Sequence, residues 1–479
     1  MRLRTLPVFL AFLAMGFADA VGPFVSLAKN EFHLSNTVAS TIPFVGFVMF
    51  GLLSIPMGVF QDKRGKKFVL MLGLVVALIG MLNAAFGLTS FARFLLTVML
   101  VGAGAAILQV SGNPIMRDVS DEGKYARNLS LAQFVKAIGS LSGPMIPVLA
   151  AKYFGASWGV IFPIYAVALV VAVVAVAGLR VGEKKSEHHA ATVRSCLALL
   201  SNGYVLMMVA AIFLYVGAEV SVSAGIPLYL KERFDIDINK VGLLGTGLFF
   251  TALTIGRFSG GVILNWIAPR KFFLITCGVS AIALLGLFVP DRTLAVASFF
   301  VAGLGFANIF PLVFAIAVEA MPEHTNELSG LMVTAILGGA CLPPLMGLVA
   351  DSSSVQLSFL VPLAAIVYIG WAALNVYKGW TVPQVREPSS VNQTVLIAAT
   401  WGVVSGACVG FLLRPDTDIG QLPFMTVISR GAYLVGIEQL WVHAAQISFN
   451  TMVAGAIVGA AVGIIIGYLM LGRHRDGSA

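Results

Sequence analysis

Apolar residues recur along this chain in blocks of roughly 20, the length that an α-helix needs to cross a bilayer. The predicted spans lie near 6–28, 39–61, 68–90, 93–115, 128–150, 157–179, 203–230, 241–265, 271–289, 293–320, 328–350, 355–377, 395–413 and 452–471. This series predicts an all-α polytopic membrane protein with about 14 spans. The first block is expected to stay as a helix, because its apolar pattern continues to about Leu27 and further spans follow.

The polar segments divide the predicted spans into groups. A charged linker at 181–202 separates six spans in 1–180 from six more in 203–380, and an extension at 381–479 holds the last two. Six spans on each side of a linker form a two-fold repeat, which is typical of transporters built from two helical bundles.

Composition and charge support this organisation. Of the 479 residues 58% are hydrophobic and only 11% are charged, too few to cover a soluble core of this size. The formal net charge is +8, and the basic residues gather in short loops on one side of the predicted spans: Lys63–Lys67, Arg117, Arg127, Lys184, Lys185 and Arg270. Such loops are typical of the cytoplasmic side, so we expect an inner-membrane protein with both termini in the cytoplasm, and no nucleic-acid partner.

We find no sequence pattern typical of an enzyme. The four cysteines are scattered without metal-ligand or redox spacing, and there is no P-loop or nucleophile elbow. We therefore expect no catalytic residue, no metal and no cofactor.

The loop after the second predicted span carries a motif. It reads Gly58-Val-Phe-Gln-Asp62-Lys63-Arg64-Gly65-Lys66-Lys67, with a shorter repeat after the eighth span, Gly256-Arg257-Phe258-Ser259-Gly260. Together the two loops resemble the signature loops of the major facilitator superfamily. The resemblance implies a fold of two six-helix bundles, here followed by two additional C-terminal transmembrane helices. It also implies a gating role for five residues: Gly58, Asp62, Arg64, Gly65 and Arg257.

A series of shorter motifs narrows the resemblance. They are Gln109-Val-Ser-Gly-Asn113-Pro114, Leu131-Ala132-Gln133, Tyr215-Val216-Gly217-Ala218-Glu219, Gly256-Arg257-Phe258, Phe310-Pro311, Gly338-Gly339 and Pro344-Leu345-Met346-Gly347. In this order the chain is similar to the fucose–proton and glucose/galactose symporter family, which implies proton-driven monosaccharide uptake. The chain departs from the fucose symporters at three polar positions: Gln109 replaces a carboxylate, Lys136 replaces an asparagine, and Asp19 lies one turn before the matching carboxylate position at Gly22.

Three ionisable residues, Asp19, Lys136 and Glu219, lie well inside predicted spans. A charge at the bilayer centre costs at least about 2.5 kcal/mol, so each should face a cavity or a partner. One interpretation makes Asp19 and Glu219 the proton-coupling residues. The other makes Asp19 and Lys136 a structural ion pair, with Glu219 capping a broken helix.

Polar side chains on the predicted spans are candidates for solute binding. We assign this role to Gln109, Asn113, Gln133, Lys136 and Asn308, because amides donate and accept hydrogen bonds as sugar hydroxyls require. Amides also join membrane helices to one another. No tryptophan falls on a predicted central helix, so an aromatic face for a sugar would come from Phe17, Phe24, Tyr215, Phe306 or Phe310.

Small residues recur every four positions in the extension. Gly402, Gly406 and Gly410 form one row, and Gly455, Gly459, Gly463 and Gly467 form another. Helices with such rows pack closely, so the stretches 402–410 and 455–467 could pack on each other, on the bundles or on a second subunit.

The sequence leaves three functions open. The first is proton-coupled uptake of a small polar solute, most simply a monosaccharide, by alternating access across the lipid bilayer. The second is export of a drug or metabolite, to which Gly139-Ser-Leu-Ser-Gly143-Pro144 gives partial support as an antiporter-like pattern. The third is a membrane scaffold or sensor that transports nothing.

Overall fold

The computed structural model describes residues 5–19, 28, 31–32, 36–87, 90–155, 157–179, 192–236, 246–380, 395, 399, 403, 407, 410, 422 and 424–472. These residues are almost entirely helical, and no β-strand occurs among them. Eleven of their helices are long and apolar enough to cross a membrane, and two shorter apolar helices accompany them. The predicted all-α membrane protein is confirmed.

The chain divides into two compact units. One comprises Met1–Thr192 with Gly203–Pro383, and the other comprises Val193–Asn202 with Gln384–Ala479. The larger unit holds the two helical bundles, and the smaller unit holds the extension together with a short helix, α8 (Val193–Leu199), from the predicted linker.

Six helices form the first bundle. They are α1 (Leu6–Asp19), α3 (Asn36–Arg64), α4 (Lys66–Ala85), α5 (Phe91–Val119), α6 (Tyr125–Phe154) and α7 (Ile161–Ala177), which a 3-10 turn at Trp158–Val160 precedes. α4 packs on α5 and α7, and α1 packs on α5, α6 and α7. Gly65 separates α3 from α4 with a φ of 90°, a backbone conformation that glycine adopts without steric cost.

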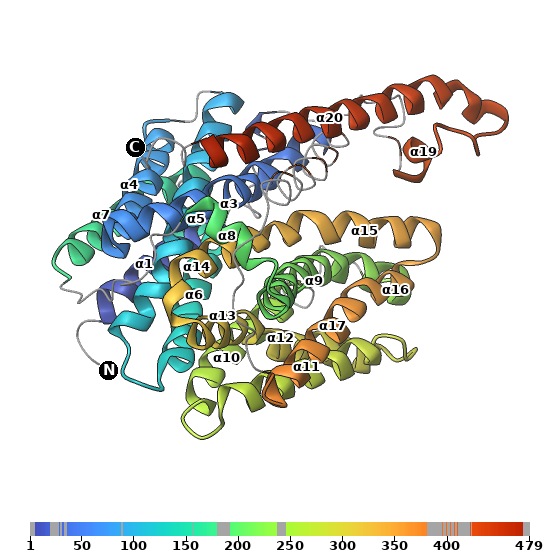
Figure 1. Ribbon diagram of the computed structural model, residues 1–479. Helices are drawn as coiled ribbons and strands as arrows, with labels where there is room; N and C mark the ends of the chain where they lie inside the picture. The colour runs from blue at the N-terminus through green and yellow to red at the C-terminus, as the bar shows by residue number, and fades with distance from the viewer. Residues whose placement is uncertain are drawn as a thin grey trace. The chain divides into compact units, whose positions relative to one another are not determined.

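The second bundle comprises α9 to α17. Its helices are α9 (Gly203–Phe234), α10 (Thr246–Ile263), α11 (Pro269–Gly286), α12 (Arg292–Phe306), α13 (Ile309–Ala320), α14 (Thr325–Thr334), α15 (Gly338–Ser352), α16 (Val355–Ser358) and α17 (Leu360–Tyr377). Figure 1 shows α9, α11, α15 and α17 lying together, as their contacts require.

Two predicted spans of this bundle are interrupted. The tenth breaks at Ala307–Asn308, between α12 and α13, and the eleventh, predicted at 328–350, passes through the 3-10 turn Ala335–Leu337 between α14 and α15. A further 3-10 turn at Pro322–His324 precedes α14. α12 and α13 form the centre of the bundle, because 89% of the most apolar stretch of Arg292–Ala320 is buried. α9 runs without a break, so the interpretation of Glu219 as the cap of a broken helix does not fit.

The extension contains α19 (Phe424–Ile428), a 3-10 turn at Gly436–Trp441 and α20 (Val442–Gly472). α20 corresponds to the last predicted span but begins ten residues before the predicted 452. The span predicted at 395–413 lies outside the described residues except for isolated positions, so the total of about 14 spans stays a prediction. One of those positions, Gly410, lies so close to Thr451 and Met452 of α20 that a side chain would not fit, so the end of the stretch 402–410 packs on α20 just before its glycine row begins.

Candidate functional site

The first bundle holds a polar group where the end of α1 meets α5 and α6. The Lys136 Nζ of α6 lies 3.4 Å from the Asp19 Oδ2 of α1 and 3.3 Å from the Gln109 Oε1 of α5. Ser140 donates a hydrogen bond of 2.9 Å to the same Asp19 oxygen. The Lys136 side chain is 15% exposed and the Asp19 side chain 44% exposed, so the pair is partly open to its surroundings.

Glycines bring these two helices together. Gly16 of α1 and Gly139 of α6 lie against the opposite backbone, at Lys136 and Leu13, so closely that neither position has room for a side chain. This close approach places Asp19 within reach of Lys136. An ion pair between Asp19 and Lys136 was one of the two interpretations of the sequence, and the structure brings these residues together.

The second bundle holds a matching group. The Arg257 Nη2 of α10 lies 3.5 Å from the Glu219 Oε1 of α9, and the two side chains are 11% and 16% exposed. The buried hydroxyl of Tyr215, one turn before Glu219, interacts electrostatically with both. Each bundle therefore carries an acid–base pair inside its spans, where a lone charge would be costly.

The predicted solute-binding amides divide into two kinds. Gln109 accepts a hydrogen bond from Lys136, and Asn308 donates one of 2.7 Å to the Gly256 carbonyl of α10, so both have partners inside their own bundle. Both amide atoms of Asn113 and the Nε2 of Gln133 are buried without a hydrogen-bond partner among the described residues.

The aromatic candidates for a sugar platform are covered. Phe17 stacks on Tyr165 with ring centroids 3.9 Å apart. Tyr215, Phe306 and Phe310 are buried and pack on one another. Phe24 lies outside the described residues.

The two bundles meet over a surface that includes one end, which we call the basic end: it carries Lys63–Lys67, Arg117, Arg127 and Arg270. The contact continues along α3, where Phe47 lies against Gly339 of α15. Here α14 of the second bundle packs on α3 and α5 of the first, and α10 packs on α6. Phe134 of α6 and Phe258 of α10 lie with ring centroids 5.2 Å apart. The bundles are thus closed against each other at this end.

Hydrogen bonds cross this contact between the bundles. Asn326 donates to Asp62 (2.8 Å), Arg117 donates to Thr325 (3.0 Å), and the Ser329 hydroxyl donates to the Val110 carbonyl (2.6 Å). A fourth bond, from Arg127 to Asn265 (3.1 Å), is exposed.

The predicted gating residues take different positions. Gly58 of α3 packs against α14: an added Cβ would be 2.9 Å from the Asn326 carbonyl oxygen. Asp62 accepts a hydrogen bond from the Asn326 side chain. Gly65 forms the turn after α3, and Arg64 is exposed. Arg257 pairs with Glu219 inside the second bundle instead of joining the loop contacts.

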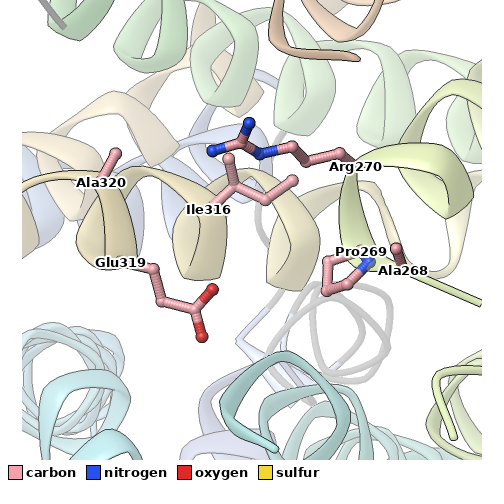
Figure 2. A pocket seen from close by; sticks show the side chains of 6 residues that line it. All are labelled: Ala268, Pro269, Arg270, Ile316, Glu319 and Ala320. Carbon is pink, nitrogen blue, oxygen red and sulfur yellow. The ribbon is translucent and has the colours of Figure 1, made fainter. Parts of the chain in front are cut away.

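Sequence reasoning missed several polar residues at this end. Asp118 binds Lys66 at 2.6 Å with both side chains nearly buried, which ties the loop after α3 to the end of α5. Glu319 of α13 interacts electrostatically with Arg117 and Arg270. Figure 2 shows Glu319 and Arg270 at a cavity of about 260 Å³, with the Glu319 carboxylate pointing away from the guanidinium. Single charged or polar residues near span ends are common, so no sequence signal distinguished them.

Two bundles of membrane helices that each carry a charge pair inside their spans and that pack together at one end define a membrane carrier and not an enzyme. A family model for the Major Facilitator Superfamily matches residues 8–336, which is more than half of the chain. The chain belongs to the Major Facilitator Superfamily and is a multi-pass membrane protein.

Named relatives resemble most of the chain. A glucose/galactose transporter of Brucella abortus is 26% identical over 378 residues, which cover 76% of this chain and 92% of that transporter. An L-fucose-proton symporter of Haemophilus influenzae is 22% identical over 415 residues, covering 78% and 95%. The crystal structure of the superfamily transporter FucP in the outward conformation matches with a TM-score of 0.67 and 18% identity, over 78% of this chain and 99% of that one. The fold predicted from the loop motifs is confirmed.

Proposed function

We propose that this protein is a secondary active transporter that carries a monosaccharide, together with protons, across a bacterial inner membrane. The names of the two relatives, a glucose/galactose transporter and an L-fucose-proton symporter, support the solute and the coupling ion. The structural observation that carries the proposal is the acid–base pair in each bundle, Asp19 with Lys136 and Glu219 with Arg257.

The basic end is assigned to the cytoplasm, because short loops rich in lysine and arginine are retained on that side. Both chain termini are then cytoplasmic. The bundles are closed at this end, so the state described here is closed toward the cytoplasm. Gly58 and Asp62 act as gate residues on α3, with Gly65 and Arg64 shaping the loop that follows.

Proton coupling is assigned to Glu219 and Asp19. Each carboxylate has a basic partner within 3.5 Å, and a proton on the acid removes the attraction that holds the pair together. The freed Lys136 or Arg257 then needs a new partner, which couples proton binding to rearrangement of the bundles. The Lys136 ammonium donates a hydrogen bond to the Gln109 amide and also pairs with Asp19. A solute hydroxyl that binds the ammonium or the amide therefore competes with the Asp19–Lys136 pair.

A ligand screen on the purified protein tests this proposal. Glucose, galactose and fucose are compared with amphipathic cations by thermal shift at several pH values, in the wild type and in Glu219→Gln. We expect one or more sugars to raise the melting temperature, with a pH dependence that Glu219→Gln removes. Stabilisation by cations alone would contradict the proposal and would favour export.

A further inference from the structure

The closed basic end contains buried amides that lack a hydrogen-bond partner among the described residues. Asn113 of α5 is fully buried and Gln61 of α3 is 1% exposed, and all four amide atoms of the two side chains lack a hydrogen-bond partner among the described residues. A buried amide that bonds to nothing destabilises the state that buries it.

Asn113 lies on the face of α5 that meets the other bundle. Val110, three residues earlier, accepts the hydrogen bond from Ser329, and Arg117, four residues later, donates to Thr325. Residues three and four apart share a helix face, so Asn113 lies between two contacts with α14.

Gln61 has the equivalent place on α3. Its neighbours Gly58 and Asp62 both contact Asn326, and Ser54, two turns earlier, lies against Gly330 of α14. The Oδ1 of Asn326 is also buried without a partner among the described residues. Three amides from α3, α5 and α14 thus surround the same contact.

We propose that Gln61 and Asn113 form a release-side binding site for solute hydroxyl groups, which exists only while the basic end is open. α14 belongs to the second bundle and the two amides to the first, so separation of the bundles uncovers both at once. Each amide then offers one acceptor and two donor hydrogens, the combination that neighbouring hydroxyls on a polyhydroxyl solute can bind. This inference rests on the proposed transport of a monosaccharide.

The site predicts an asymmetry between the two faces of the membrane. In the closed state the two amides are buried, so solute that enters from the opposite end does not contact them. Replacement by leucine, which has a similar size and no polar atom, removes the release-side contacts and also the unsatisfied groups of the closed state.

The experiment compares sugar counterflow in right-side-out and inside-out vesicles for the wild type, Gln61→Leu and Asn113→Leu. We expect each variant to raise the half-saturation concentration at the basic end about tenfold and to leave that at the opposite end within about twofold. Ser448→Ala on α20, which also removes a buried unpaired hydroxyl, is the matched control and should change neither.

A half-saturation concentration that changes equally at both ends, or that changes at neither end, would overturn the inference. If the leucine variants fold poorly, Asn113→Cys in a background without the native cysteines replaces them. A thiol reagent applied at the basic end should label it, sugar on that side should slow labelling, and absence of this protection would equally overturn the inference. A wild type that shows no sugar counterflow from either side would instead overturn the proposed function and this site with it.

Discussion

At the scale of single residues, the proposed proton coupling rests on the two acid–base pairs. Glu219 and Arg257 are 3.5 Å apart and mostly buried, whereas Asp19 is 44% exposed beside Lys136. When one partner becomes neutral, the more buried pair loses more electrostatic attraction, because water screens its charges less. We therefore expect Glu219 to be the principal coupling residue.

The first prediction concerns Glu219→Gln, which keeps the size of the side chain and removes its negative charge. Proton-driven accumulation should be lost while sugar exchange across the membrane persists, since exchange needs no net proton movement. Uptake assays with and without a proton gradient measure both activities. Asp19→Asn is the comparison, with a smaller expected loss, and exchange abolished together with accumulation would contradict this assignment.

The second prediction concerns the hydrogen bonds that close the basic end. Asn326→Ala removes the partly buried bond to Asp62, and a hydrogen bond to a charged group contributes about 1.5–3 kcal/mol. The open population at that end should rise more than tenfold. Spin labels at Lys63→Cys and Glu323→Cys, which are exposed and lie on opposite bundles, report the change as a longer distance.

Asn265→Ala supplies the matched control for this measurement. It removes an inter-bundle bond to Arg127 that is exposed to solvent, so its effect should be several-fold smaller. Equal effects of the two variants would show that burial does not determine the strength of the gate.

At the scale of helices, the apolar pattern predicted most elements but not their interruptions. The break at Ala307–Asn308 begins four residues before Pro311, which has no backbone N–H to bond the Ala307 carbonyl and whose ring clashes with it. At the break the Asn308 side chain donates to the Gly256 carbonyl, a tertiary contact. The predicted start of α20, at 452, was too late. The helix begins at Val442, and its first turns carry polar residues such as His443 and Gln446, so these turns do not belong to an apolar block.

The candidate site was predictable only in part. Asp19 and Lys136 could be matched because few charges lie inside spans, and the glycine–aspartate motif indicated Gly58 and Asp62. The pairing of Arg257 with Glu219 depends on how α9 and α10 align, which no local pattern encodes. Thr325, Asn326 and Ser329 are ordinary polar residues that acquire a role only when α14 meets α3 and α5.

The third prediction tests the helix contact itself. Gly58→Ala places a methyl carbon 2.9 Å from the Asn326 carbonyl oxygen, which is closer than a normal contact, and overpacking costs about 1–3 kcal/mol. The basic end should close less often, seen as a longer distance between the same spin labels. Gly347→Ala in α15, where an added Cβ meets nothing within 4 Å, should leave the distance unchanged, and a similar shift there would contradict the explanation.

At the scale of the whole molecule, the larger unit is expected to contain the carrier. It ends at Pro383, and the alignments with the two relatives cover 92% and 95% of their lengths with 76% and 78% of this chain. A chain that ends after Pro383 should therefore keep sugar exchange within about twofold of the full chain, because the bundles retain their contacts. Counterflow in proteoliposomes measures this, and complete loss in a folded protein would assign part of the carrier to the extension.

The central claim is that this protein accumulates a monosaccharide at the expense of a proton gradient. The most direct test is uptake of radiolabelled glucose, galactose or fucose by proteoliposomes with an acidic exterior. We expect accumulation above the external concentration, its collapse on addition of a protonophore, and only equilibration with Glu219→Gln. Uptake that ignores the gradient, or no uptake of any of these sugars by a folded protein, would contradict it.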